Sequence, residues 1–246
     1  MAFERRYVAG LACAVALVLA APFAHAEESE TWKRCRNDNH AFAFDLQITA
    51  CTTIIKSGRE STNNLSNAYL DRGNGYYNKN DNDRAMADYN EAIRLNPKSA
   101  IAYDMRANAY SDMGDHDRAI SNYNESIRLN SKDPVAYNNR CDELLQIRQL
   151  QAAFADCNES LRMRPSHANT LTHRANVYLA LGQFDKALAD YDAAIKLKPK
   201  DAWALYGRGM TRLKKGDTAG GDGDIAAAKA VSAGIAASFA NSYGIK

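Results

Sequence analysis

The chain has 246 residues, of which 46% are hydrophobic and 24% are charged. Its 31 Lys and Arg residues nearly balance its 29 Asp and Glu residues, so the formal net charge is only +2. This balance gives no electrostatic reason to expect a nucleic-acid partner or an anionic membrane surface. By length alone, one or two globular domains would be expected.

Residues 1–26 have the three parts of a secretory signal peptide: two arginines, an apolar run over residues 8–21 and an Ala-His-Ala cleavage site. The apolar run is shorter than the ~20 residues that span a bilayer, which disfavours an uncleaved membrane anchor. Cleavage near Ala26 would leave a chain that begins at Glu27. No second apolar stretch approaches a membrane span, so we expect no stable membrane insertion and a periplasmic or secreted location.

The rest of the sequence is dominated by a pattern that recurs with a period of about 34 residues. Within residues 168–199, two helical patterns follow each other, and Gly182 and Pro199 end them. Neither helix alone can bury its apolar stripe, so the two are expected to pair as an αα-hairpin. Steps of one period reach matching positions in the other copies: Ala187, Ala153, Ala119 and Ala85; Tyr191, Cys157, Tyr123 and Tyr89; Pro199, Pro165, Ser131 and Pro97.

A 34-residue helix–turn–helix with small residues at fixed places resembles the tetratricopeptide repeat (TPR). The resemblance implies an all-α fold, a right-handed superhelical solenoid of stacked repeats in which each unit packs on its neighbours. The expected divisions are a signal peptide at 1–26, a degenerate N-terminal hairpin and loop at 27–65, repeats at 66–233 (66–99, 100–133, 134–167, 168–201 and 202–233), and a capping helix and tail at 234–246.

Four places are expected to depart from the regular repeat. Residues 57–64 are polar and predict a longer loop. Arg148 replaces the turn glycine of the third repeat and predicts a less regular turn. Glycines between 220 and 223 predict that the last second helix begins late, near Asp222, because each mid-helix Gly costs ~1 kcal/mol. Finally, an i, i+4, i+8 apolar pattern predicts a helix over 233–242 that covers the apolar end of the stack.

An arginine recurs in every repeat, and a carboxylate or amide follows it sixteen positions later. A buried arginine needs an acceptor because an unpaired buried charge is costly, so we predict structural ion pairs. A basic groove for acidic ligands is the alternative. The arginines are Arg72, Arg106, Arg140, Arg174 and Arg208, and the matching residues are Asp88, Asn122, Asp156, Asp190 and Asp224.

Four cysteines remain after the signal peptide, and they form two pairs with a spacing of 16: Cys35 with Cys51, and Cys141 with Cys157. In the other repeats, these two register positions hold a small and a large residue, which indicates that they touch across the hairpin. Because an exported chain meets an oxidising compartment, we predict these two disulfides out of three possible connectivities. A redox-active or metal-binding pair is the alternative.

Enzyme motifs are missing from the sequence, which has no GxSxG, no glycine-rich phosphate loop, no HExxH and no metal-type CxxC. None of the histidines after the signal peptide has a ligand spacing to another, and His116 is interpreted as a turn-packing residue. The recurring tyrosines are interpreted as core. We therefore predict no catalytic residue, no metal site and no cofactor.

Proteins that resemble this fold generally bind peptides or partner proteins on the inner wall, which the first helix of each repeat forms. A column of side-chain amides there could pair with the backbone of an extended peptide. The lysines that join such asparagines in a carboxylate clamp are absent, so no clamp is predicted. A solvated wall without a ligand is the alternative. The predicted groove residues are Asn74, Asp104, Asn108, Asn138, Asp142, Thr172 and Asn176.

The sequence thus predicts a non-catalytic scaffold, exported to the bacterial cell envelope, that binds an unidentified protein or peptide. Two alternatives stay open. One is an enzyme or enzyme accessory with an unrecognised groove site. The other is a module that binds cell-envelope glycan, which the location would allow.

Overall fold

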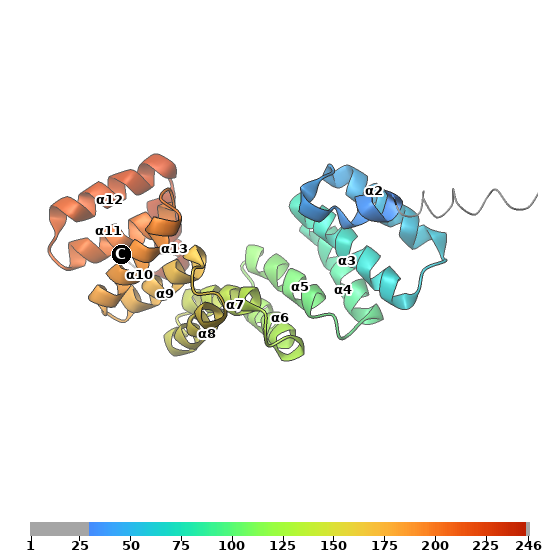
Figure 1. Ribbon diagram of the computed structural model, residues 1–246, viewed down its shortest axis with the longest axis horizontal. Coiled ribbons are helices and arrows are strands. Elements are labelled where there is room, and N and C mark those ends of the chain that lie inside the picture. Colours follow the sequence, from blue (N-terminus) through green and yellow to red (C-terminus); the bar gives the residue numbers. More distant parts are fainter. Residues whose placement is uncertain (1–29, 245–246) are drawn as a thin grey trace, which may run out of the picture.

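The computed structural model describes residues 30–244, so the signal peptide predicted over 1–26 lies outside the described residues. The elements follow each other as helices joined by short turns along an arc (Figure 1). Over residues 30–244, no helix has both the length and the apolar character to cross a membrane. Because the elements of the described residues are successive helices that pack as repeating pairs, this part of the chain is an all-helical repeat solenoid.

From α3 onward, each pair of successive helices forms one hairpin, with a first helix on the inner side of the arc and a second helix outside it. A 3-10 turn, η1 (Asp38–His40), and helix α2 (Phe44–Ser57) precede the hairpins. The first helices are α3 (Thr62–Asn78), α5 (Ala100–Asp112), α7 (Pro134–Gln146), α9 (Ala168–Ala180) and α11 (Ala202–Lys214). The second helices are α4 (Asn82–Leu95), α6 (His116–Leu129), α8 (Leu150–Met163), α10 (Phe184–Leu197) and α12 (Thr218–Val231). Helix α13 (Ile235–Tyr243) follows them.

Within a hairpin, a small residue on the first helix faces a large one on the second. A Cβ atom placed on Gly73 would lie 2.7 Å from the ring of Tyr89, and one on Gly209 would lie 2.8 Å from Ile225. The second-helix tyrosine is fully buried in the first hairpin. The two helices can therefore approach closely enough to bury one large side chain between them.

The turn inside each hairpin uses one left-handed residue, whatever its identity. Arg148 has φ 64°, close to φ 71° at Gly182 and φ 73° at Gly114. The prediction of a less regular turn at Arg148 is therefore wrong. A non-glycine residue with this backbone costs about 1–2 kcal/mol, which the surrounding hairpin overcomes.

Two helices begin earlier than predicted. Helix α12 starts at Thr218 rather than near Asp222, because the side chain of Asp217 accepts a hydrogen bond from the Gly220 amide. Its glycines serve packing: a Cβ on Gly221 would lie 3.0 Å from the Gly209 carbonyl oxygen, so only glycine fits there. Helix α3 starts at Thr62, inside the loop predicted over 57–64, because Ser61 caps it through the Asn64 amide.

The recurring arginines join neighbouring repeats. Arg174 on α9 donates from Nε and Nη2 to the two oxygens of Asp190, at 2.7 and 2.8 Å, and from Nη1 to Asn158 of the preceding repeat at 2.8 Å. Arg106 differs because the matching residue, Asn122, is an amide and not a carboxylate. Nε of Arg106 donates to Oδ1 of Asn122 at 2.8 Å. The remaining bidentate pairs are Arg72 with Asp88, Arg140 with Asp156 and Arg208 with Asp224. The guanidinium groups are thus engaged by the fold rather than free for an acidic ligand.

Two disulfide bonds hold two of the helix pairs. Cys35 is bonded to Cys51, which fixes the helical residues 30–36 to α2. Cys141 is bonded to Cys157, which joins α7 to α8. All four cysteines are fully buried.

The sequence predicted that the last helix covers the apolar end of the stack. In the structure, α13 lies mainly against the concave wall instead. It turns back after α12 and lies on the inner side of the arc, where it contacts α11, α12 and α7 (Figure 1). Its three regularly spaced apolar residues, Ile235, Phe239 and Tyr243, are buried there. The predicted amphipathic helix is present, but its partner surface is the concave wall.

Candidate peptide-binding groove

The seven predicted groove residues all lie on first helices, on α3, α5, α7 and α9 in turn. They differ in accessibility. Asn74, Asn108 and Asp142 are half-buried. The other four are buried: Asp104, Asn138, Thr172 and Asn176. The structure therefore leaves about half of the predicted column accessible in this conformation.

The asparagine column holds the tyrosines of the second helices. The hydroxyl of Tyr89 donates to Oδ1 of Asn74 at 3.0 Å, and Tyr123 donates to Asn108 at 2.6 Å. The Tyr191 hydroxyl donates in the same way to Asn176, which is fully buried. The asparagines are therefore part of the hairpin packing, and a ligand in the groove could reach only the side chains that stay half-buried.

The third repeat breaks this pattern, and α13 completes it. Asp142 stands in place of the asparagine, and Cys157 stands in place of the tyrosine. Oδ1 of Asp142 instead accepts a hydrogen bond from the hydroxyl of Tyr243 on α13 at 3.0 Å. Burial, followed by the charge of Asp142, raises the pKa of Tyr243 well above its ordinary value, while Asn176 opposes the shift. Tyr243 therefore remains a neutral hydrogen-bond donor across the physiological pH range.

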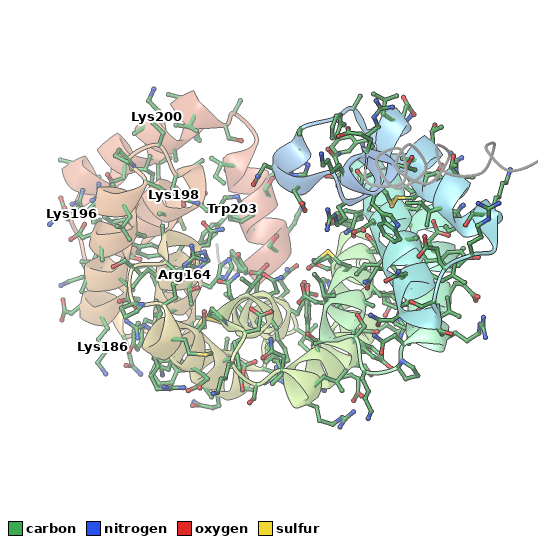
Figure 2. All side chains as sticks on the ribbon, turned by 45° about the vertical axis from the view of Figure 1, so that its right-hand side comes forward. Arg164, Lys186, Lys196, Lys198, Lys200 and Trp203 are labelled. Atoms are coloured by element: carbon green, nitrogen blue, oxygen red, sulfur yellow. A yellow bond between two sulfur atoms is a disulfide. The ribbon has the colours of Figure 1, made fainter. Side chains whose placement is uncertain are left out.

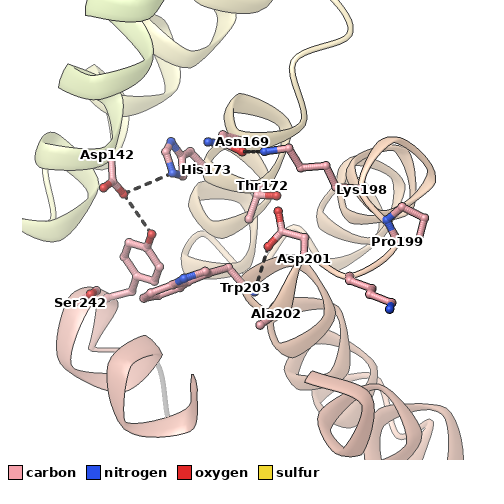
Figure 3. A pocket seen from close by; sticks show the side chains of 12 residues that line it. Asp142, Asn169, Thr172, His173, Lys198, Pro199, Asp201, Ala202, Trp203 and Ser242 are labelled. Carbon is pink, nitrogen blue, oxygen red and sulfur yellow. Dashed lines mark hydrogen bonds and ion pairs between the residues drawn. The ribbon is translucent and has the colours of Figure 1, made fainter. Parts of the chain in front are cut away.

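A hollow of about 940 Å³ opens beside this contact, between α9, α11, the residues that link α10 to α11, and the end of α13 (Figure 3). Nε2 of His173 lies 3.7 Å from Oδ1 of Asp142 on one wall. The hollow is lined by Asp142, Asn169, Thr172, His173, Lys198, Pro199, Lys200, Asp201, Ala202, Trp203, Ser242 and Tyr243. Two of the predicted groove residues, Asp142 and Thr172, thus lie in one hollow, and the other five do not line it.

Trp203 is the large apolar side chain of the hollow, and the sequence reasoning missed it. Its ring centroid lies 5.6 Å from that of Tyr243 and 5.9 Å from that of Phe239. Its position in the first helix corresponds to Ile101 and Val135, which are exposed apolar residues on α5 and α7. Large apolar residues at this recurring position were the signal that could have identified the wall.

Charged groups of both signs surround Trp203. Asp201 is occupied as the N-cap of α11, where it accepts from the amides of Trp203 at 3.0 Å and Ala204 at 3.2 Å. Nζ of Lys198 donates to Asn169 at 2.7 Å, and Lys200 is exposed. Figure 2 shows both lysines on the C-terminal half of the molecule, together with Trp203. The hollow thus combines an aromatic wall with a mixed-charge rim, as peptide-binding surfaces do.

The wall in the N-terminal half is acidic and sensitive to pH. Burial, with a further contribution from Asp133, raises the pKa of Asp104 to about 7, although Asn108 opposes the shift. Burial and the charge of Asp38 raise the pKa of Asp71 to about 7. In the described chain, Oδ1 of Asp104 is buried without a hydrogen-bond partner. This part of the wall therefore gains negative charge as the pH rises through 7.

A buried carboxylate joins the second and third repeats. Glu143 on α7 is 2% exposed and accepts from the hydroxyl of Ser111 at 2.5 Å. Its other oxygen lies 2.8 Å from Nδ1 of His116, the residue interpreted from the sequence as turn packing. His116 therefore contributes a polar contact between repeats as well as packing. Over residues 30–244, no three His, Cys, Asp or Glu side chains gather as metal ligands would.

Models of repeat families match three segments of the chain. The model described as TPR repeat matches residues 73–114 and 175–216, and the model described as tetratricopeptide repeat matches residues 100–133. Among curated proteins, no sequence matches this one. The family matches fall on hairpins that the structure places in one stack.

Solved structures of repeat proteins are similar to most of the solenoid. YrrB, described as a TPR protein with an unusual peptide-binding site, has a TM-score of 0.60 at 20% identity, over 75% of this chain and 93% of that one. MamA from Desulfovibrio magneticus RS-1 has a TM-score of 0.62 at 16% identity, and the match covers 70% of this chain and 96% of that one. PilW, described as a type IV pilus biogenesis factor, has a TM-score of 0.63 at 18% identity, and the match covers 72% of this chain and 87% of that one. Identities this low show the fold alone, and the family matches show that the chain carries tetratricopeptide repeats over residues 73–133 and 175–216.

Proposed function

We propose that this protein is a non-catalytic scaffold of the bacterial cell envelope that binds a partner protein or peptide on the concave face of the solenoid. The observation that carries the proposal is the 940 Å³ hollow in that face, with Trp203 in its wall. A partly exposed tryptophan in a concave surface supplies apolar contact area at a low cost in side-chain entropy, which is typical of binding hot spots. The described peptide-binding site of YrrB, a protein of similar fold, supports the same class of function.

The rim of the hollow supports a peptide rather than a purely apolar ligand. His173, Asp142 and Lys200 offer donors and acceptors around the aromatic wall, so the main chain and polar side chains of a peptide can be satisfied there. The half-buried Asn74 and Asn108 extend the polar surface toward the N-terminal half. The proposal therefore keeps the predicted groove but places its centre at Trp203.

Export is the second part of the proposal. Two buried disulfide bonds are compatible with an oxidising compartment, and the sequence over 1–26 has the parts of a signal peptide. N-terminal sequencing of protein recovered from periplasm or medium should begin at Glu27. Recovery in the membrane fraction with Met1 intact would contradict the cleavage.

Capture from an envelope extract with the mature protein tests the binding. Mass spectrometry should identify a stoichiometric protein or peptide. Retention of small molecules alone, together with their turnover, would favour an enzyme instead.

Trp203→Ala then tests the site, with Val135→Ala as a matched control because it removes an apolar residue from the same register position on α7. Trp203→Ala should weaken the captured complex at least tenfold, and Val135→Ala should leave it unchanged. Circular dichroism spectra must match the wild type in both variants. Equal affinities for the two variants would remove the hollow as the site. Alanine at Asn108 and Asn176 is a poorer test, because each of these residues holds a buried tyrosine.

A further inference from the structure

Helix α13 occupies part of the concave face in the way a ligand would. Its residues at i, i+4 and i+8, Ile235, Phe239 and Tyr243, point into the wall and are 2%, 0% and 4% exposed. Phe239 packs on the rings of Trp203 and Tyr206, at centroid distances of 5.9 and 5.1 Å. The intervening residues 237 and 238 are exposed. The contact is therefore that of an amphipathic helix laid into a groove.

The third repeat is adapted to receive this helix. Its left-handed turn residue is Arg148, where the next repeat has glycine, and Nη1 of Arg148 donates to the Tyr243 carbonyl oxygen at 2.8 Å. Its groove position is Asp142, whose Oδ1 accepts from the Tyr243 hydroxyl at 3.0 Å. Both departures from the repeat pattern thus contact the same residue of α13. The arginine is kept at a backbone conformation that disfavours it, where its side chain also satisfies the end of a helix.

We propose that this seat is the binding site for an amphipathic helix of a partner protein, and that α13 is its intramolecular occupant, displaced when the partner binds. The proposal rests on the proposed function and names the partner's chemistry. The partner helix carries a large aliphatic residue, an aromatic residue four positions later and a tyrosine four positions after that. Its last turn lies at Arg148, and the face that enters the groove is uncharged, as it is in α13.

The attachment of α13 is suited to displacement. The link from α12 consists of the exposed residues 232–234, which include Gly234. The described hydrogen bonds from α13 to the third repeat both involve its last residue, Tyr243, and the buried face of the helix makes apolar contacts. A link of only three residues keeps α13 beside the groove at an effective concentration of roughly millimolar or more, and an external helix of comparable chemistry must compete with it. Weakening the docking of α13 should therefore strengthen the binding of an external helix.

The experiment uses the full mature chain and a fluorescein-labelled synthetic peptide with the sequence of residues 232–246. The test variant carries Phe239→Ala and Tyr243→Ala together, and Ser238→Ala, on the exposed face of α13, is the matched control. In fluorescence anisotropy titrations, the peptide should bind the double variant at least tenfold more tightly than it binds the wild type or Ser238→Ala. A peptide with both aromatic residues replaced by alanine should bind none of them.

Equal peptide affinity for wild type and double variant, or no binding to the double variant, would overturn the proposal. Hydrogen exchange of the wild type gives an independent measurement: amides of α13 should exchange well before those of α11, and equal protection would overturn displacement. Loss of the helical circular dichroism signal in the double variant would show that the fold requires α13, and this result would also overturn the proposal. Wild-type dimers abolished by the double substitution would identify a second copy as the occupant. In each of these cases, a captured partner that still depends on Trp203 would leave the proposed function intact.

Discussion

At the residue scale, the solenoid depends on polar pairs that repeat with the period. Arg174 and Asp190 have side chains that are 23% and 12% exposed and share two parallel hydrogen bonds. Arg162 and Glu159 make a similar pair on the surface, but their side chains are 68% and 33% exposed. The two pairs look alike in distance and differ in solvation, so they should differ in energetic weight.

Arg174→Met should destabilise the protein by roughly 3 kcal/mol, because it leaves the Asp190 carboxylate largely buried without its partner. Arg162→Met should cost less than about 1 kcal/mol. Replacing both Arg174 and Asp190 by apolar residues should recover part of the first loss. Urea unfolding followed by circular dichroism measures all three, and equal losses for the two single variants would contradict the assignment.

Asp104→Asn should stabilise the protein at pH 8 and change it little at pH 4. The folded pKa of Asp104, about 7, lies above the unfolded value, so ionisation opposes folding increasingly as the pH rises from about 4 to about 7. Three pH units correspond to a ceiling of about 4 kcal/mol. Thermal unfolding at both pH values provides the measurement, with exposed Asp222→Asn as control. A gain of equal size at pH 4 would exclude the titration as its cause.

At the element scale, the turn of each hairpin requires one residue with a left-handed backbone conformation. Asn80 and Arg148 take the left-handed conformation that glycine supplies elsewhere. Asparagine adopts this region at a lower cost than arginine does, so Arg148 stands out as a strained residue that also contacts α13.

Arg148→Gly and Arg148→Ala separate these two effects. Both lose the hydrogen bond to Tyr243, but only glycine relieves the turn. Arg148→Gly should therefore be more stable than Arg148→Ala by about 1 kcal/mol in thermal or urea unfolding. Gly182→Ala, at the same place in the next repeat, should cost a similar amount. Equal stability of the two Arg148 variants would show that the turn is not strained.

The two disulfide bonds each close a loop of about 15 residues and should each contribute ~3 kcal/mol in the chain-entropy model. Oxidised, unfolded mature protein should show no free thiol with a thiol reagent. Reduction should lower the unfolding midpoint, and replacing Cys141 and Cys157 together should reproduce part of that loss. Two or more free thiols without reductant would contradict the pairing.

At the scale of the whole molecule, α13 adds a contact that the repeats alone would not make. A solenoid is held by neighbours, so distant segments normally do not touch. Here Tyr243 is bonded to Arg148 and Asp142, which precede it by 95 and 101 residues. This contact covers part of the C-terminal half of the concave face, so a ligand for that half must displace α13 or bind beside it, in the hollow.

The sequence by itself determined the repeat architecture, because the pattern that specifies it occurs again in every repeat. This pattern consists of the 34-residue period, the small and large residues that face each other across the hairpin, and the recurring arginines. The tertiary structure decided the rest. The low helix propensity of glycine argued against a helix at Gly221. The structure has a helix there because Gly221 packs closely against the backbone of Gly209 on the neighbouring helix. The spacing of Ile235, Phe239 and Tyr243 showed that one face of α13 is buried, but not against which surface, because an amphipathic pattern carries no information about its partner. The register position of Trp203 on α11 places it on the concave wall, but only the docking of α13 decided that the rings of Phe239 and Tyr243 lie against it.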